Sequence, residues 1–447
     1  MRVSGSVAEC SLTDVVAAVD HDEAGEWLHG LIAELYPIPR SITGDGVRQT
    51  LARIGEEIPL SVKEVATGTE VLDWTVPREW NIRDACIKDL DGDRVVDFQR
   101  SNLHVMSYSV PVERRVSREE LGEHLFSLPD HPDWIPYRTS YYNEAWGFCV
   151  SERQREALRD AEYYVLIDST LANGALTYAE CLLEGELHDE VLVSCHVCHP
   201  SLCNDNLSGI AVATALARTL AEPRRRFSYR FLFVPGTIGS ITWLARNEAH
   251  LDRVKHGLVL TCVGDGGRST YKRSRRGDAE VDRAMAHVLR HSGQDYELLD
   301  FSPWGYDERQ YCSPGFDLPV GCLMRTPHGR FPEYHTSADD LDLVRPEALA
   351  DSYAKCLRLF DVLERNRTYL NTTPKGEPQL GRRGLYQAVG GQVDREAVQM
   401  AMLWVLNQSD GSKDLLEIAT RSSLSYETIA NAAALLRDHG LLDEARR

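Results

Sequence analysis

Buried strands alternate with helices between residues 190 and 325, and this alternation constrains the fold more than any other feature of the sequence. Apolar segments such as "DEVLVSCH", "YRFLFVPG", "HGLVLTCV" and "DLPVGCLMRT" are separated by helical stretches such as "LSGIAVATALARTLAE" and "AEVDRAMAHVLRHSG". Strands without a polar face are covered on both sides, and helical crossovers make neighbouring strands parallel. The sequence therefore predicts an α/β fold with a mostly parallel mixed sheet.

Two further regions differ from this α/β core. Residues 71–160 are dense in Trp, Tyr and Pro and carry short alternating runs such as "DRVVDF", which predicts an inserted β-rich domain. The α/β domain then takes residues 20–70 and 161–375. After the Gly/Pro-rich stretch "TTPKGEPQLGRRG", three helical segments predict a winged-helix-like domain over residues 390–447.

Charge and composition limit the partners and the cellular location that we expect for this chain. The net charge of -19 disfavours a nucleic-acid backbone as partner. The opening "MRVSGSVAECSLTDVV" shows no apolar stretch of a signal peptide, and no run of apolar residues is long enough for a membrane span. We expect a cytoplasmic protein, without membrane contact, whose 11 cysteines are reduced.

The segment "SCHVCHPSLCNDNLSG" allows three interpretations. Its C-x-x-C-H pattern is that of covalent haem attachment, which normally requires export. A zinc knuckle needs a second Cys/His pair nearby, but after Cys203 the next cysteine is Cys262. The third interpretation is a metal site at the edge of the predicted sheet, and it is the one the surrounding residues favour.

In that interpretation the strand over residues 190–196 delivers His196 to its carboxyl end, where ligand sites of open α/β sheets lie. Asp205 follows in a loop before a helix, and "EYHTSADDLDLV" supplies His335 far downstream. Two imidazoles and one carboxylate suit zinc and leave positions for water and substrate. His199 stands directly before Pro200 and is more typical of a structural residue.

These segments resemble the M28-type zinc aminopeptidases, and more closely an aminopeptidase-like branch of unknown function, the DUF4910/DUF2172 type, with an inserted β domain and a C-terminal winged helix. "WTVPREWNI", "RTSYYNEAWGFCVS", "YKRSRRG" and "DERQYCSPGF" look like signatures of that branch. The resemblance implies an aminopeptidase-type catalytic domain in which His196 and His335 are metal ligands and Asp205 is the bridging carboxylate.

One departure from the resembled family affects the metal count. The resemblance implies two glutamates at the end of the next strand, one a metal ligand and one the general base. Here "FVPGTIGS" places Gly236 and Thr237 there, and the position of a further Asp ligand falls on Thr261 or Cys262. We therefore expect one Zn²⁺ per chain, held by His196, Asp205 and His335, in place of two.

A replacement for the missing base must come from another carboxylate. Asp307 and Glu308 in "GYDERQYC" match a polar turn that lies near the metal in the resembled enzymes, and Glu308 is the first candidate acid or base. Glu333, two residues before His335, is another. A solvated or ion-paired carboxylate remains the competing interpretation for each of the three.

A local basic cluster follows the predicted strand around residue 270. Lys272, Arg273, Arg275 and Arg276 could bind a carboxylate or phosphate of a substrate. A solvated hairpin is the competing interpretation.

The winged-helix-like domain has few cations for a DNA reader. Residues 394–447 contain six lysines and arginines against nine aspartates and glutamates, and the third helix carries Arg437 against Glu427 and Asp438. Phosphate neutralisation needs several cations. We expect a packing or dimerisation module, so that a homo-oligomer is compatible with this chain and nucleic acid is not a partner.

Together these features favour a zinc-dependent hydrolase that acts on an amide bond of a small aminoacyl or peptidyl compound. A role in polysaccharide or specialised-metabolite biosynthesis comes from the resemblance alone. The alternative is an altered or inactive aminopeptidase-fold protein that binds a ligand without cleaving it, which the missing glutamate pair favours.

Overall fold

The computed structural model describes residues 11–385 and 395–445, and the chain divides into two compact units. The first comprises Met1–Ala279 and Asp295–Ala354, and the second comprises Glu280–Gln294 and Lys355–Arg447. None of the described helices is both long and apolar enough to cross a bilayer.

An eight-stranded sheet forms the centre of the first unit. The four middle strands, β12, β11, β13 and β16, are parallel to one another. On one side of them, β14 pairs antiparallel with β16 and parallel with β15. On the other side, β10 pairs antiparallel with both β12 and β1. In spatial order the strands are β1 (Ser61–Ala66), β10 (Ala175–Leu183), β12 (Ser228–Val234), β11 (Glu190–His196), β13 (Val254–Leu260), β16 (Val320–Met324), β14 (Ser269–Lys272) and β15 (Tyr296–Leu299). The predicted α/β fold with a mixed sheet is confirmed.

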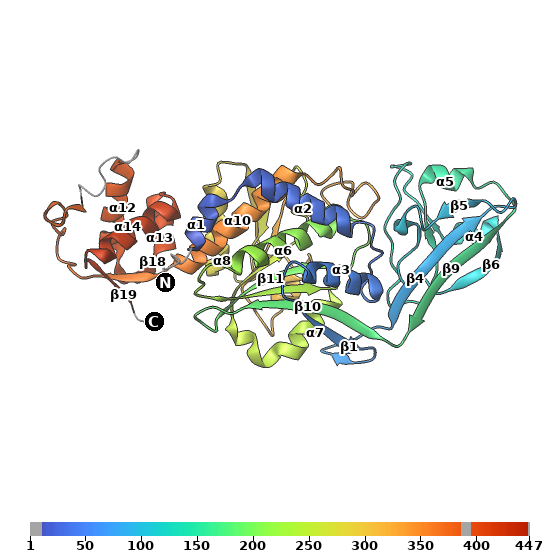
Figure 1. Cartoon of the computed structure of the whole chain (residues 1–447), viewed down its shortest axis with the longest axis horizontal. Helices are drawn as coiled ribbons and strands as arrows, with labels where there is room; N and C mark the ends of the chain where they lie inside the picture. The colour runs from blue at the N-terminus through green and yellow to red at the C-terminus, as the bar shows by residue number, and fades with distance from the viewer. Residues whose placement is uncertain (1–10, 386–394, 446–447) are drawn as a thin grey trace, which may run out of the picture. The chain divides into compact units, whose positions relative to one another are not determined.

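Helices cover both faces of this sheet. Helix α6, which begins directly after the Asp205 loop, is buried along most of its length and packs against α2 on one face, whereas α7 lies on the other (Figure 1). The helices of this unit are α1 (Leu12–Ala18), α2 (His21–Leu35), α3 (Asp45–Gly55), α4 (Arg118–Glu123), α5 (Glu152–Ala157), α6 (Ser208–Leu220), α7 (Ile238–Asn247) and α9 (Glu308–Tyr311), and α10 (Pro346–Arg365) contributes to both units.

A separate antiparallel sheet forms the β-rich part of the first unit. Its order is β5 (Arg94–Asp97), β4 (Glu79–Lys88), β9 (Glu162–Ala172) and β6 (Val112–Ser117), accompanied by the short pairs β2 (Glu70–Val71) with β3 (Trp74–Thr75) and β7 (Leu125–Phe126) with β8 (Phe148–Cys149). A loop of this region reaches the α/β core, because the N–H of Tyr137 donates to the carbonyl of His335 at 2.8 Å and that of Ile135 donates to Ser337 Oγ at 2.9 Å. The β-rich region is therefore built against the loop that carries His335.

The second unit combines helices with a three-stranded sheet ordered β18–β17–β19. Asp414 caps α13 through a reciprocal capping box with Glu417, and Ser425 caps α14. The elements are α8 (Glu280–Arg290), β17 (Thr368–Asn371), α12 (Arg395–Gln408), β18 (Asp410–Asp414), α13 (Leu415–Ser422), α14 (Tyr426–Asp438) and β19 (Leu442–Glu444). The three helices predicted near the C-terminus are all present.

Candidate metal centre

His196 is the last residue of β11, at the carboxyl end of the central parallel strands. Every residue of β11 is buried, which explains why the sequence of this strand is an apolar run. The side chain of His196 is fully buried, so its ring nitrogens need partners within the protein.

Asp205 lies in the turn Cys203–Leu207 that precedes α6, and Asp339 fixes this turn. The backbone N–H groups of Asn204 and Asp205 donate to the two carboxylate oxygens of Asp339 at 2.5 and 3.0 Å. Asn204 in turn donates its side-chain amide to Asp265 at 3.0 Å. Asp265 therefore supports the turn, and Asp339 holds Asp205 in place, although no sequence pattern singles out Asp339.

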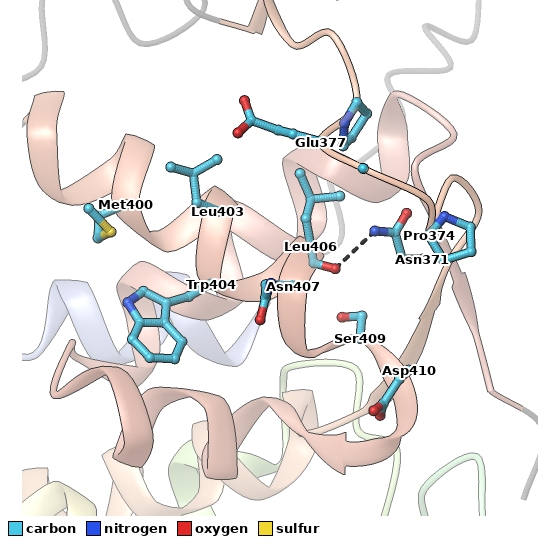
Figure 2. Close-up of a pocket in the computed structure, with 12 residues that line it drawn as sticks. Asn371, Pro374, Glu377, Met400, Leu403, Trp404, Leu406, Asn407, Ser409 and Asp410 are labelled. Carbon is cyan, nitrogen blue, oxygen red and sulfur yellow. Dashed lines mark hydrogen bonds between the residues drawn. The ribbon is translucent and has the colours of Figure 1, made fainter.

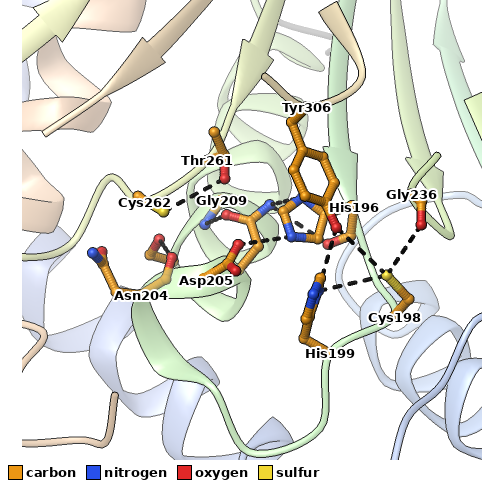
Figure 3. A network of polar contacts seen from close by, with 12 residues as sticks. His196, Cys198, His199, Asn204, Asp205, Gly209, Gly236, Thr261, Cys262 and Tyr306 are labelled. Atoms are coloured by element: carbon orange, nitrogen blue, oxygen red, sulfur yellow. Dashed lines mark hydrogen bonds and ion pairs between the residues drawn. The ribbon is translucent and has the colours of Figure 1, made fainter. Parts of the chain in front are cut away.

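Three imidazoles surround the Asp205 carboxylate, and Figure 3 shows two of them, those of His196 and His199. His196 Nε2 lies 2.9 Å from Asp205 Oδ1, and His335 Nε2 lies 3.0 Å from Asp205 Oδ2. The ring of His199 is centred 4.9 Å from the ring of His196 and 5.1 Å from that of His335. The structure thus brings together the three residues proposed as metal ligands and adds His199 to them.

Protonation in this cluster follows from burial and hydrogen bonding. The side-chain amide of Asn206 is oriented by two hydrogen bonds: its Oδ1 accepts from Gly209 N–H, and its Nδ2 donates to the carbonyl of Leu260. The same Nδ2 faces His196 Nδ1 at 3.3 Å. Because Nδ1 accepts from this amide, the proton of His196 is on the Nε2 that faces Asp205. Burial holds the pKa of His199 well below its usual value, so this ring is neutral at pH 7.

Asp205 itself is ionised. Burial opposes its charge, but the hydrogen bonds from His196 and His335 hold the pKa of Asp205 well below its usual range. The side chain of His335 is 33% exposed, whereas Asp205 and His196 are buried. Solvent and small molecules therefore reach the cluster on the His335 side.

The donor set fits a divalent metal ion of the zinc type. The ligand atoms of His196, His199 and Asp205 lie within 4.8 Å of one another, and His335 faces the other oxygen of the same carboxylate. Imidazole nitrogens with one carboxylate are typical zinc ligands. To hold an ion through Nε2, each neutral imidazole would carry its proton on Nδ1 instead.

Tyr306 occupies the space beside Gly236. Its ring stacks on His196 with 3.7 Å between centroids, and its hydroxyl lies 3.5 Å from His199 Nδ1. A Cβ atom at Gly236 would lie 2.3 Å from Cε1 of Tyr306. A tyrosine ring therefore stands where the resembled enzymes would carry a glutamate side chain, and no sequence pattern had singled out Tyr306.

The three carboxylates proposed as acid or base differ in their surroundings. Glu308 is buried, forms an ion pair with Lys272 Nζ at 2.8 Å and accepts the N–H of Tyr306 at 3.0 Å. Asp307 is fully buried, with Oδ1 accepting from Ser240 Oγ at 2.7 Å and Oδ2 unpartnered among the described residues. Burial raises the pKa of Asp307 to about 6.

Glu333, the third of these carboxylates, is half-buried, and its backbone carbonyl accepts from Thr336 N–H at 3.0 Å. With its pKa raised to about 6, Asp307 can exchange a proton near neutral pH.

The predicted basic cluster is distributed over separate ion pairs. Besides the buried pair of Lys272 with Glu308, Arg273 lies 3.2 Å from Asp300, and Arg275 and Arg276 lie 2.8 and 3.2 Å from Asp317. Each of the four cations thus has a carboxylate partner that is distant in sequence. A substrate-binding role for them stays a prediction.

Comparison with known proteins gives the family. A family profile described as "Domain of unknown function (DUF4910)" matches residues 29–366, and a winged helix-turn-helix profile matches residues 367–444. The chain belongs to the DUF4910 family. This DUF4910 protein is 52% identical over 414 residues, covering 93% of this chain and 95% of the relative, to a "Putative polysaccharide biosynthesis protein with aminopeptidase-like domain" of Clostridium acetobutylicum.

Solved structures give the same architecture. A crystal structure of a "putative peptidase" from Clostridium acetobutylicum matches with a TM-score of 0.92 and 49% identity, covering 97% of this chain and 99% of that one. A zinc aminopeptidase from Bacillus subtilis matches with a TM-score of 0.56 and 14% identity over 75% of this chain and 94% of that one. A Peptidase M28 precursor from Shewanella amazonensis matches with a TM-score of 0.55 and 13% identity, covering 79% of this chain and 96% of that one. The DUF4910 domain therefore has an aminopeptidase-like fold, as the resemblance implied.

Proposed function

We propose that this DUF4910 protein is a metal-dependent hydrolase that cleaves an amide bond of a small aminoacyl or peptidyl compound. The observation that carries the proposal is the convergence of His196, His199 and His335 on the buried carboxylate of Asp205. A buried carboxylate ringed by imidazoles is a costly arrangement that a bound cation compensates. The likeness in fold to zinc aminopeptidases supports zinc as that cation.

One zinc ion per chain is the proposed stoichiometry. His196, Asp205 and His335 are its proposed ligands, and His199 lies close enough to complete the set. When bound, the ion lowers the pKa of a water molecule and polarises a carbonyl group. A second ion would need carboxylates that Gly236 and Thr237 do not supply.

Tyr306 and Asp307 are the proposed proton-handling residues. The Tyr306 hydroxyl, beside His199, can donate a hydrogen bond to the oxygen that becomes negative during attack on an amide. Asp307 follows Tyr306 in the chain, and its raised pKa suits a group that accepts and returns a proton. Glu308 has the different role of holding Tyr306 through the buried pair with Lys272.

Aromatic residues restrict the substrate to a small compound. Tyr137 from the β-rich region packs edge-on against His199 and His335, at 5.1 and 5.2 Å between ring centroids, and Tyr334 stacks on His335 at 3.9 Å. These rings stand at the exposed side of the cluster. We expect short aminoacyl or peptidyl compounds to enter and folded proteins to be excluded.

The name of the Clostridium acetobutylicum relative suggests a place in polysaccharide biosynthesis, and a specialised-metabolite role is equally compatible with such a substrate. The ten cysteines of the described residues are buried and form no disulfide, which is compatible with a cytoplasmic location.

The test is amide hydrolysis by the zinc-loaded full chain, followed by mass spectrometry over a panel of aminoacyl and short peptidyl amides. Wild type and His188→Ala, which alters an exposed histidine, should cleave the same compounds. Asp205→Asn and His196→Ala should not.

The alternative function, an aminopeptidase-fold protein that only binds its ligand, is favoured by the loss of the glutamate pair at Gly236 and Thr237. It predicts binding of a panel compound without cleavage by any of these proteins.

A further inference from the structure

The winged-helix unit contains a cavity of about 620 Å³ that no part of the proposed function uses. Its volume lies in the range of sites for small organic molecules, roughly 300–1,000 Å³. Every lining residue belongs to the second unit, and they come from the exposed side of α12, the segment 374–378 and the ends of β17 and β18 (Figure 2).

The apolar part of the lining is the side of α12 that does not face the core. Met402 and Val405 are buried, whereas Met400, Leu403 and Trp404 form a stripe at helical spacing on the other side. Met400 is 45% exposed. A helix side that faces solvent is usually polar, so an apolar stripe over a cavity points to an occupant with an apolar body.

The polar part of the lining is acidic. Glu377 and Asp410 line the cavity, and no lysine or arginine does so among the described residues. The N–H and hydroxyl of Ser412 donate to Asp410 and lower its pKa, so this carboxylate is charged at neutral pH. An anionic ligand would be repelled here, whereas a cation would be attracted.

We propose that this cavity binds a small organic ammonium compound with an aromatic or aliphatic body. The ammonium group donates to the carboxylate of Glu377, and the charge of Asp410, at the other side of the lining in Figure 2, adds to the attraction. The body packs on Leu403 and Trp404, where the indole also attracts the positive charge. The winged-helix unit is thereby a ligand-binding module, whatever the hydrolytic centre acts on.

The test compares three probes of similar shape on the full chain by isothermal titration calorimetry: phenethylamine, 2-phenylethanol and 3-phenylpropionate. Phenethylamine should bind at least about fivefold more tightly than the alcohol, and the carboxylate should not bind. Glu377→Gln should weaken the binding of phenethylamine severalfold. Glu427→Gln, which alters an exposed carboxylate on α14 outside the cavity, should leave it unchanged.

Equal affinity for the amine and the carboxylate, or no binding of any probe at millimolar concentration, would overturn the proposal. So would self-association of the wild-type chain that Trp404→Ser abolishes, because the apolar stripe would then serve a second copy of the chain. Trp404→Leu keeps the apolar lining, and if it folds it should retain binding of the alcohol while losing part of the preference for the amine.

Discussion

Replacing Asp307 with asparagine should make the protein more stable at neutral pH while impairing the proposed reaction. Asp307 is fully buried, and its pKa is raised from 3.8 to about 6. The folded state therefore holds a proton that the unfolded state releases near pH 4. Its stabilising contribution is fully present below pH 4 and is lost as the pH rises through about 6.

The magnitude follows from the shift. About two pKa units correspond to about 3 kcal/mol of stability lost between low and neutral pH, and about half of this, about 1.4 kcal/mol, falls between pH 5 and pH 8. Asparagine does not titrate and keeps a carbonyl oxygen for the Ser240 hydroxyl. The gain of Asp307→Asn over wild type should thus grow by about 1.4 kcal/mol across that interval.

The assay is urea unfolding of the metal-free full chain at several pH values, followed by circular dichroism. Asp300→Asn is the control, because the side chain of Asp300 is 91% exposed and should show no such trend. Parallel pH profiles for wild type and Asp307→Asn would refute the reasoning, since they would mean that Asp307 is ionised in the folded protein with its charge compensated.

Three further predictions follow from the site and from the winged-helix unit. Tyr306→Phe should lower turnover by about tenfold or more with little change in KM, because the ring still stacks on His196 while the hydroxyl donor is lost; an unchanged turnover would show that the hydroxyl takes no part. Gly236→Glu should lower the thermal midpoint without raising activity, because its Cβ would lie 2.3 Å from the Tyr306 ring. The double variant with Tyr306→Ala should recover the lost stability. A Gly236→Glu protein as stable as wild type would show that the ring moves freely. The winged-helix unit should show no salt-sensitive affinity for duplex DNA in a titration monitored by fluorescence anisotropy, because residues 394–447 carry six lysines and arginines against nine aspartates and glutamates. Strong binding that falls with added salt would establish a DNA partner.

The fold could be predicted from the sequence because its main strands are apolar throughout. Strand β11 occupies residues 190–196, as the run "DEVLVSCH" indicates, and its end places His196 at the edge where ligands bind. The sequence also indicates Asp205 and His335 as candidate ligands, because each sits in a distinctive local segment that resembles the M28-type enzymes; their role as ligands stays a prediction. Their mutual distance depends on a sheet that brings the two segments together.

The remainder of the site depends on contacts that no local pattern records. His199 joins the cluster only because the chain turns back after β11, and Tyr306 reaches His196 from a loop more than a hundred residues downstream. The carboxylates that pair with the basic cluster are likewise distant in sequence, as Asp317 is from Arg275 and Arg276. Residue types alone could not distinguish those ion pairs from a substrate-binding surface.

The zinc content of the full chain tests the central claim most directly. After zinc loading and removal of excess metal, elemental analysis should give about one zinc per wild-type chain, with an anomalous-scattering peak beside Asp205. His196→Ala and His335→Ala should lose the ion and remain folded, because the stability of the large sheet does not depend on one ion. The zinc content of His199→Ala shows whether this third imidazole is also a ligand. Two ions bridged by Asp205, or a wild-type chain that retains no metal, would contradict the account.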